Sequence, residues 1–297
     1  MAACGRRERR LYAVIPKATS HLFFLTVKRG VDEAAREFGV DVDWNGPRDE
    51  TDHSRQIQIL DAAVARSVAG IAISATDERA LAAPVERAIA AGIPVVAFDS
   101  TVDARGLKSV IATDNRGAGE LAARTLGGLV GGKRKVAMVM QKPGGTSTGL
   151  RESGFEETLA REFPGATLAA KQYSMADAAR AYAAAENILT AHSDLSGMFA
   201  SSEASSLGAI RAIEARGLAG RVKLVTFDTS ETHVAALRDG TIDVMLVQDA
   251  RKLGHDAVEA LVQAEYPARV AIPVQSIREG DLARPEAREL ITPPDRR

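Results

Sequence analysis

The sequence is poor in cysteine and in aromatic residues: among 297 residues it has one cysteine, Cys4, and only 4% are aromatic. A single thiol cannot form an internal disulfide or build a cysteine-based metal site. No apolar run approaches the ~20 residues that a membrane-spanning helix needs. The histidines lack metal-binding spacing such as HExxH, so we expect surface or helix-capping roles for them; they are His21, His53, His192, His233 and His255.

The small net charge and the lack of catalytic motifs argue against nucleic-acid-binding proteins and enzymes. The formal net charge is −1, so the chain has no overall electrostatic footprint for nucleic acid or an anionic membrane. Gly127–Arg134 resembles a phosphate-binding loop, but Arg134 replaces the required Ser or Thr and a strand is expected to follow it. No G-x-S-x-G nucleophile elbow occurs. We therefore expect that the protein is not an enzyme and that it binds no cofactor, metal or nucleic acid.

From Leu11 onward, short apolar runs alternate with stretches of helical period, which is typical of βα units on a parallel sheet. The length favours two domains over one. Strands are predicted at Leu11–Ile15, Val40–Trp44, Gly70–Ser74, Pro94–Phe98, Ser109–Ala112, Lys135–Met140, Thr167–Gln172, Gly197–Ala200, Lys223–Phe227 and Asp243–Val247.

An internal echo links the two halves of the chain. Ser74 follows an apolar strand as Ser202 does 128 residues later, and Asp99 is matched by Asp228 at an offset of 129. Two echoes at nearly one offset predict two half-chains with the same strand order. Residues just past the carboxyl ends of parallel strands face a ligand crevice, so each half is expected to present a serine and an aspartate to a shared cleft. The alternative for either aspartate is that it caps the following helix.

Several segments carry a family resemblance by their order and spacing: Ala13–Lys17 leading to Phe23 and Phe24, then Gly92–Asp99, Ala112–Asn115 and Asn187–His192. From about Leu11 to about Ile277 the chain resembles the ribose-binding-protein family, the type 1 periplasmic sugar-binding proteins of ABC transporters. The resemblance implies an α/β fold of two doubly wound parallel-sheet lobes with a ligand cleft between them. It also implies a monomer that closes on a monosaccharide or polyol and delivers it to a membrane permease.

The resemblance also implies roles for particular side chains. Phe23 and Phe24 match an aromatic wall for the sugar ring, although Phe24 can equally be helix core. Asp99 matches an acceptor of hydroxyl hydrogen bonds and Arg151 a donor, with a solvated helix face as the alternative for Arg151. Asp228 matches an acceptor in the second half. Gln248 matches a mixed donor and acceptor, or else a structural hinge residue.

Some expected site positions depart from the family pattern. Ser74, His21 and Ser202 stand where pentose binders have asparagines, and Ser100 stands where they have an arginine. Met175 and Ala176 replace an aromatic, and Lys17 and Glu203 are expected at the rim of the cleft. These groups predict a pocket roomier than ribose fills. An amino acid, held by Arg151 or Lys17 together with Asp228, is the second expected ligand class.

The expected domain boundaries follow from the same pattern. The first lobe comprises residues 11–113 with 249–275, the second comprises residues 114–248, and residues 276–297 form a C-terminal tail. The chain is expected to cross between lobes near Asp114, Gln248 and Ser276, and closure is expected to occur by hinge motion.

The N-terminal residues 1–10 are predicted to form a short tether. Met1–Gly5 resembles a lipobox, which implies a lipidated Cys4 and a membrane-anchored, extracytoplasmic protein; the alternative is a stray thiol. A competing function is the ligand-sensing domain of a lactose-repressor-type regulator or of a signalling receptor. Such a regulator carries a helix-turn-helix before its first strand, and only ten residues precede Leu11 here.

Overall fold

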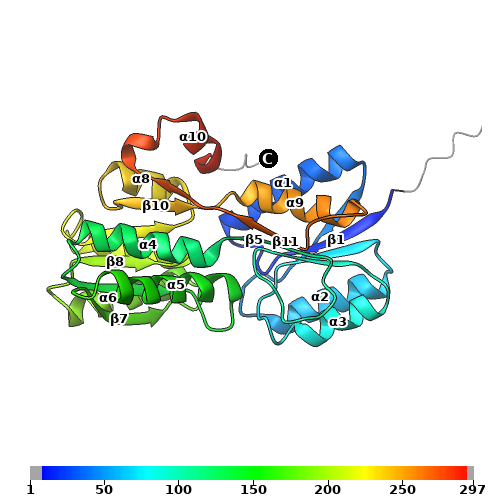
Figure 1. The fold of residues 1–297 in the computed structure, drawn as a ribbon, viewed down its shortest axis with the longest axis horizontal. Helices are drawn as coiled ribbons and strands as arrows, with labels where there is room; N and C mark the ends of the chain where they lie inside the picture. The colour runs from blue at the N-terminus through cyan, green and yellow to red at the C-terminus, as the bar shows by residue number, and fades with distance from the viewer. Residues whose placement is uncertain (1–8, 293–297) are drawn as a thin grey trace, which may run out of the picture.

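The computed structural model describes residues 9–292 and consists of two α/β lobes that lie side by side (Figure 1). Each lobe is built on a six-stranded sheet that is covered by helices on both faces. Parallel strands require this double covering, because both of their faces are apolar. The predicted lipidation position, Cys4, lies outside the described residues.

The first sheet is entirely parallel. Its strands are β1 (Leu11–Ile15), β2 (Asp41–Trp44), β3 (Gly70–Ile73), β4 (Val95–Phe98), β5 (Ser109–Thr113) and β11 (Arg269–Ile272), and its helices are α1 (Leu22–Phe38), α2 (His53–Ala65), α3 (Ala82–Ala90) and α9 (Ala250–Val262). The strand order is β11-β5-β4-β3-β1-β2. Helices α1 and α9 cover one face, and α2 and α3 cover the other.

The second sheet repeats this architecture. Its strands are β6 (Lys135–Met140), β7 (Thr167–Tyr173), β8 (Gly197–Ala200), β9 (Lys223–Phe227), β10 (Val244–Val247) and β12 (Gln275–Ile277). Its helices are α4 (Asn115–Leu129), α5 (Thr146–Glu162), α6 (Ala178–Ala191), α7 (Glu203–Ala215), α8 (Glu231–Arg238), the 3-10 turn η1 (Glu279–Asp281) and α10 (Pro285–Ile291). The order β12-β10-β9-β8-β6-β7 matches the first sheet strand for strand, except that β12 runs antiparallel to its neighbour.

The ten predicted strands are all present, each with ends within one residue of the prediction, and the predicted repeat of strand order is confirmed. The sequence did not predict β11 and β12. These strands have only four and three residues, they flank Pro273, and they lie at sheet edges where most of their side chains are exposed. Short, half-exposed edge strands carry too little apolar pattern to be detected.

The chain passes three times between the two sheets. The first passage joins β5 to α4 at Asp114, and the second joins β10 to α9 at Gln248 and Asp249. The third joins β11 to β12 through Pro273 and Val274, and it is visible in Figure 1 as the long ribbon that runs from one lobe to the other. Ser276 lies within β12, so this passage precedes it. No helix among residues 9–292 is both long and apolar enough to span a membrane.

Helix packing sets the position of the strand ends that matter for function. Helix α1 buries Phe24, Val27 and Val31 on one face, and it ends at Gly39, whose φ of 63° is left-handed. In the second lobe α4 and α5 approach so closely at Gly119 that an added Cβ would lie 1.9 Å from the carbonyl oxygen of Arg151. The missing side chain therefore lets α5 carry Arg151 into the interior between the lobes.

Candidate ligand-binding site

A small cavity lies between the two lobes, at the carboxyl ends of the parallel strands. Its volume is about 30 Å³, room for roughly two water molecules and too little for a monosaccharide. A monosaccharide can therefore enter only when the lobes part. The cavity is lined by residues of both lobes: Lys17, His21, Phe23, Phe24, Glu50, Asp99, Gln141, Ser147, Thr148, Arg151, Ser202, Glu203, Asp228 and Gln248.

The two echoed aspartates occupy equivalent and strained positions. Asp99 follows β4 with a φ of 56°, and Asp228 follows β9 with a φ of 68°. Each donates its backbone N–H to the neighbouring strand, Asp99 to the Ile111 oxygen at 2.8 Å and Asp228 to the Leu246 oxygen at 2.9 Å. Left-handed backbone is uncommon outside glycine and clusters at functional sites. Neither aspartate is a helix N-cap among the described helices.

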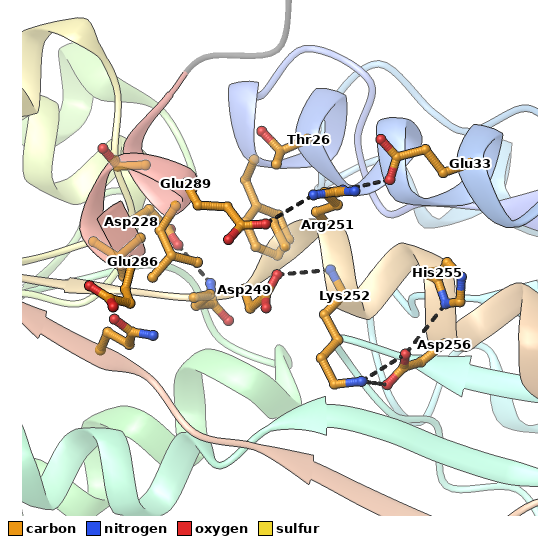
Figure 2. Close-up of a pocket in the computed structure, with 17 residues that line it drawn as sticks. Thr26, Glu33, Asp228, Asp249, Arg251, Lys252, His255, Asp256, Glu286 and Glu289 are labelled. Carbon is orange, nitrogen blue, oxygen red and sulfur yellow. Dashed lines mark hydrogen bonds and ion pairs between the residues drawn. The ribbon is translucent and has the colours of Figure 1, made fainter. Parts of the chain in front are cut away.

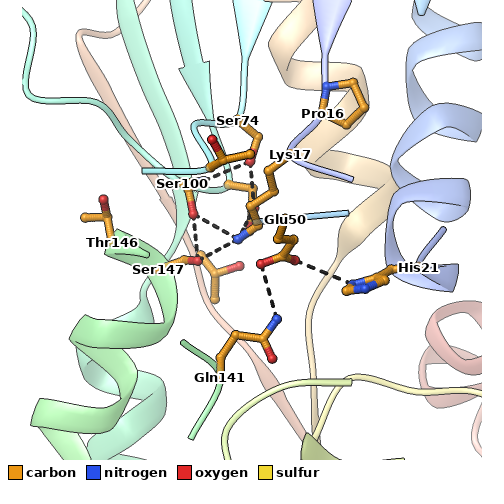
Figure 3. Close-up of polar contacts among 12 residues, drawn as sticks. Pro16, Lys17, His21, Glu50, Ser74, Ser100, Gln141, Thr146 and Ser147 are labelled. Carbon is orange, nitrogen blue, oxygen red and sulfur yellow. Dashed lines mark hydrogen bonds and ion pairs between the residues drawn. The ribbon is translucent and has the colours of Figure 1, made fainter. Parts of the chain in front are cut away.

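Asp99 is paired with the buried ammonium group of Lys17, which Figure 3 shows beside Ser100 and Ser147. The Lys17 Nζ lies 3.0 Å from Asp99 Oδ2 and donates to the hydroxyls of Ser100 and Ser147 at 2.9 and 3.1 Å. Ser74 donates its hydroxyl to Asp99 at 2.8 Å. Burial by itself lowers the pKa of Lys17, but the nearby carboxylates outweigh it and the net pKa is raised. The ammonium is therefore charged at neutral pH.

A second buried carboxylate, Glu50, comes from the connection between β2 and α2. It accepts a hydrogen bond from Gln141 Nε2 at 3.2 Å across the cleft, and His21 Nδ1 lies 3.5 Å from it (Figure 3). Burial raises the pKa of Glu50, but Lys17 and His21 lower it by more, so the net pKa is below the ordinary value. Glu50 is thus an ionised acceptor within the cavity wall.

Arg151 supplies a guanidinium from the second lobe. Its side chain is buried, donating to Asn115 Oδ1 at 2.8 Å and to the Ser201 carbonyl, and its Cζ lies 3.3 Å from the centre of the Phe227 ring. Burial lowers its pKa to about 10, which keeps it charged at neutral pH. Its Nε has no hydrogen-bond partner among residues 9–292. The alternative of a solvated helix face is therefore wrong for Arg151.

Asp228 and Gln248 join the second lobe to the hinge. Gln248 Nε2 donates to Asp228 Oδ1 at 2.6 Å, while Thr113 Oγ1 donates to Gln248 Oε1 at 2.6 Å. Burial raises the pKa of Asp228, which Arg151 only partly offsets. Gln248 lines the cavity and also ties the second passage between the lobes to Thr113, at the start of the first. The Gln248 side chain therefore lies in the cavity wall and in the hinge at the same time, and the two expected roles do not exclude each other.

Two aromatic side chains form the apolar part of the wall. Phe23 and Phe24 begin α1, and their rings meet edge to face with centres 5.0 Å apart. Phe24 lines the cavity and also belongs to the core of the first lobe, whereas Phe23 is only half-buried. Phe23 thus offers the more accessible ring.

Two predicted site residues lie behind the wall instead of on it. Ser74 and Ser100 contact Asp99 and Lys17, and neither lines the cavity. Sequence reasoning missed four lining residues: Glu50, Gln141, Ser147 and Thr148. Gln141 directly follows β6, so the strand-end rule applied to that strand identifies it. Ser147 and Thr148 lie in the first turn of α5, and Glu50 has no comparable signal.

One histidine prediction is wrong. His233 is fully buried, with its Nδ1 2.7 Å from the Ser230 hydroxyl, instead of lying at the surface. Burial lowers its pKa to about 4, so it is neutral at physiological pH.

A larger cavity of about 370 Å³ lies on the hinge side and shares Phe23, Asp228 and Gln248 with the smaller one. Its two cations are paired with carboxylates of the same cavity: Figure 2 shows Arg251 between Glu33 and Glu289. Lys252 pairs there with Asp256. The smaller cavity has buried charges from both lobes and an unpartnered guanidinium nitrogen, so we take it as the ligand site in spite of its size.

The fold and this site define a two-lobed ligand-binding protein. The chain belongs to the family of the periplasmic binding protein domain, which it matches over residues 12–265. It is 29% identical to the ribose import binding protein of Bacillus subtilis over 238 residues, which are 80% of this chain and 76% of that protein.

Solved structures resemble the whole chain. A carbohydrate transporter solute-binding protein of Agrobacterium radiobacter in complex with D-arabinose has a TM-score of 0.93 and 28% identity, covering 96% of this chain and 99% of its own. An ABC transporter solute-binding protein of Agrobacterium vitis bound with α-D-tagatopyranose has a TM-score of 0.90 and 29% identity, covering 95% of this chain and 99% of its own.

Proposed function

We propose that this chain is the solute-binding protein of a sugar ABC transporter, and that it binds a monosaccharide in the cleft between its lobes without chemical conversion. One observation carries the proposal: acceptors, a guanidinium and an aromatic wall from two different lobes converge on one cavity. A polyol needs this combination, because its hydroxyls donate and accept while the C–H face of its ring is apolar. The relatives are sugar-binding transport proteins, which agrees with the proposal.

Each site residue has a proposed role in sugar recognition. The Asp99 and Asp228 carboxylates accept hydrogen bonds from sugar hydroxyls, Arg151 donates through its unpartnered Nε, and Phe23 contacts the ring face. Glu50 and Gln141 complete the polar wall. The lobes move as two bodies about the three passages: residues 11–113 with 249–272 form one, and residues 114–248 with 275–291 form the other. Binding favours the closed form because only that form brings both sets of groups to the ligand.

The ligand is proposed to be a neutral monosaccharide. Related proteins carry D-arabinose, D-tagatose and D-fucose, which vary in size and stereochemistry. The cavity wall includes four carboxylates, Glu50, Asp99, Glu203 and Asp228, against the two permanent cations Lys17 and Arg151. The anionic group of a uronic acid or a sugar phosphate would lie beside these carboxylates, so such ligands are disfavoured.

A binding screen tests the proposal. We expect a saturable rise in melting temperature with at least one of D-arabinose, D-tagatose, D-fucose, D-ribose and D-allose, and a smaller radius of gyration in solution scattering at saturation. Amino acids are the second arm, since Arg151 and Asp228 can pair with a carboxylate and an ammonium. A response to an amino acid and to none of the sugars contradicts the proposal, as does turnover of any sugar.

The cellular setting belongs to the same proposal. The relatives act in import systems, so an extracytoplasmic location and a membrane permease as partner are inferred for this chain. We propose that Cys4 is lipidated and anchors the protein. In cells that express the chain with a lipoprotein signal, the wild type should fractionate with membranes and Cys4→Ser should be released. Equal partitioning of both forms would reject the anchor.

A further inference from the structure

The Glu203 side chain accepts hydrogen bonds from the start of a helix in the opposite lobe. Glu203 is the first residue of α7 in the second lobe, yet its side chain reaches the start of α1 in the first lobe. The backbone N–H of Leu22 donates to Glu203 Oε1 at 3.3 Å, and that of Phe23 donates to Oε2 at 3.0 Å. The residue is only 8% exposed. Both carboxylate oxygens are thus engaged by one helix N-terminus across the cleft.

The start of α1 needs such an acceptor. The first N–H groups of a helix have no partner within the helix and carry its positive dipole end. The N-cap residue of α1, His21, makes no side-chain capping hydrogen bond. Glu203 therefore supplies from the opposite lobe the acceptor that His21 does not supply. Burial raises the pKa of Glu203, so the carboxylate also depends on these N–H donors when the lobes are closed.

We propose that Glu203 is a closure latch and not a sugar ligand: its carboxylate caps α1 when the lobes meet and fixes the Phe23 ring against the second lobe. The inference rests on the proposed function and deepens it, because it assigns Glu203 a positioning role in closure. When the lobes part, Leu22 and Phe23 lose their acceptor. Sugar affinity then depends on Glu203 although the sugar does not contact it.

The second lobe contains a matched control. Ser230 and Glu231 begin α8 as Ser202 and Glu203 begin α7, with a serine N-cap followed by a glutamate. Glu231 is exposed and makes no hydrogen bond with the first lobe among the described residues. Glu231→Ala therefore removes a glutamate from the same helical position without touching the latch.

The latch can also be removed from the α1 side. Leu22 is the first helical residue of α1, a position where proline is tolerated, and Leu22→Pro deletes the N–H that donates to Glu203. His21 before it has φ −88° and ψ 139°, an extended conformation compatible with a following proline. Leu22→Ala removes the same side chain and keeps the N–H, so it is the control.

The experiment measures affinity by titration calorimetry, using the monosaccharide of the screen that stabilises the wild type most. Glu203→Ala should weaken binding about 10- to 100-fold, because two charge-assisted hydrogen bonds of the closed form are lost. Glu231→Ala and Leu22→Ala should stay within about threefold of the wild type. Leu22→Pro should weaken binding, and Leu22→Pro with Glu203→Ala should weaken it no more than Glu203→Ala alone. Multiplying effects in the double variant would instead mean that Glu203 contacts the sugar, and would overturn the latch.

Amide hydrogen exchange at a saturating concentration of that monosaccharide gives a second measurement. In the closed form the Phe23 amide should exchange at least about tenfold faster in Glu203→Ala than in Glu231→Ala. If none of the sugars binds the wild type, the proposed function fails and the latch fails with it. If a sugar binds and the Phe23 amide exchanges equally in the two variants, the latch alone is overturned.

Discussion

The two lobes place equivalent aspartates at equivalent strand ends but surround them differently. Asp99 contacts the ammonium of Lys17 and the hydroxyl of Ser74, both from its own lobe. Asp228 contacts the amide of Gln248 and the backbone N–H of Glu203, and Arg151 is the nearby cation. The backbone repeat therefore fixes where a carboxylate stands, whereas its neighbours decide how its charge is compensated. In the first lobe the aspartate forms an ion pair, whereas in the second lobe it accepts hydrogen bonds from a side-chain amide and a backbone N–H.

The serines show the same divergence. Ser74 supports Asp99, whereas its counterpart Ser202 caps α7 through the N–H of Ser205 and donates to Gln141. The two residues were detected through one sequence echo, and the echo identified their positions correctly. Their roles differ because the helix after β8 begins directly at the strand end, while the segment after β3 continues as a loop before α3.

Removing each aspartate gives the largest test of this comparison. Asp99→Ala and Asp228→Ala should each weaken sugar binding at least about tenfold, because a buried acceptor of hydroxyl hydrogen bonds is lost. Their effects on stability should differ. Asp99→Ala leaves the Lys17 ammonium buried without its partner and should lower the free energy of unfolding by about 3–5 kcal/mol. Asp228→Ala leaves amide donors without an acceptor and should lower it by about 1–3 kcal/mol.

Urea unfolding and sugar titration measure both effects. The exposed Asp103 provides the control, since Asp103→Ala should change neither quantity. Combining Asp99→Ala with Lys17→Met should restore part of the lost stability but not the sugar affinity. Equal stability losses in the two aspartate variants would show that the ion pair does not distinguish the lobes.

Arg151 tests whether the second lobe contributes its own donor. Arg151→Met should weaken sugar binding about 10- to 100-fold, because a buried charged donor is worth more than a neutral one. It should also reduce the compaction seen by scattering, since the first lobe keeps Asp99 and Phe23 and can hold the sugar alone. Full compaction in Arg151→Met would mean that closure does not depend on this guanidinium.

Asp228 and Glu50 line the same cavity, but their contributions to stability should depend on pH in opposite directions. Burial raises the pKa of Asp228, so its contribution to stability is complete below its unfolded pKa of about 3.9 and is lost as pH rises through the folded value. Burial acts likewise on Glu50, but Lys17 and His21 reverse the net shift and lower its pKa. The contribution of Glu50 is therefore present above its unfolded pKa of about 4.3 and is lost as pH falls through the folded value.

Two isosteric variants measure these opposite slopes. The stability of the wild type minus that of Asp228→Asn should fall as pH rises from about 3 to about 7. The difference between the wild type and Glu50→Gln should rise over the same range. Urea unfolding at several pH values gives both differences, and slopes of the same sign would contradict the assigned charge environments.

The serine pair should give the smallest effects. Ser202→Ala removes the N-cap of α7 and should lower the free energy of unfolding by about 1 kcal/mol. Ser74→Ala removes a hydrogen bond to Asp99 and should cost sugar binding about 1 kcal/mol, with a smaller effect on stability. Calorimetric titration measures the loss of sugar affinity in both variants, and urea unfolding measures the loss of stability. Equal losses of affinity and of stability in the two variants would mean that the two serines have the same role.

The sequence alone predicted the ten main strands, the repeat of the strand order and most of the residues around the cavity. The strands were predictable because buried parallel strands are continuous apolar runs, and the two aspartates because the residue after such a strand faces the crevice whatever the rest of the chain does. The family resemblance pointed to Arg151, which joins Asp99 and Asp228. All three line the cavity.

Only the tertiary structure decided which of these groups meet. Glu50 comes from a loop with no strand-end signal, and it becomes part of the site because the second lobe brings Gln141 to it. The contact between Glu203 and the start of α1 joins residues about 180 positions apart. Local sequence patterns encode secondary structure and the direction of side chains, but the pairing of charges across a cleft depends on how two separately folded surfaces come together.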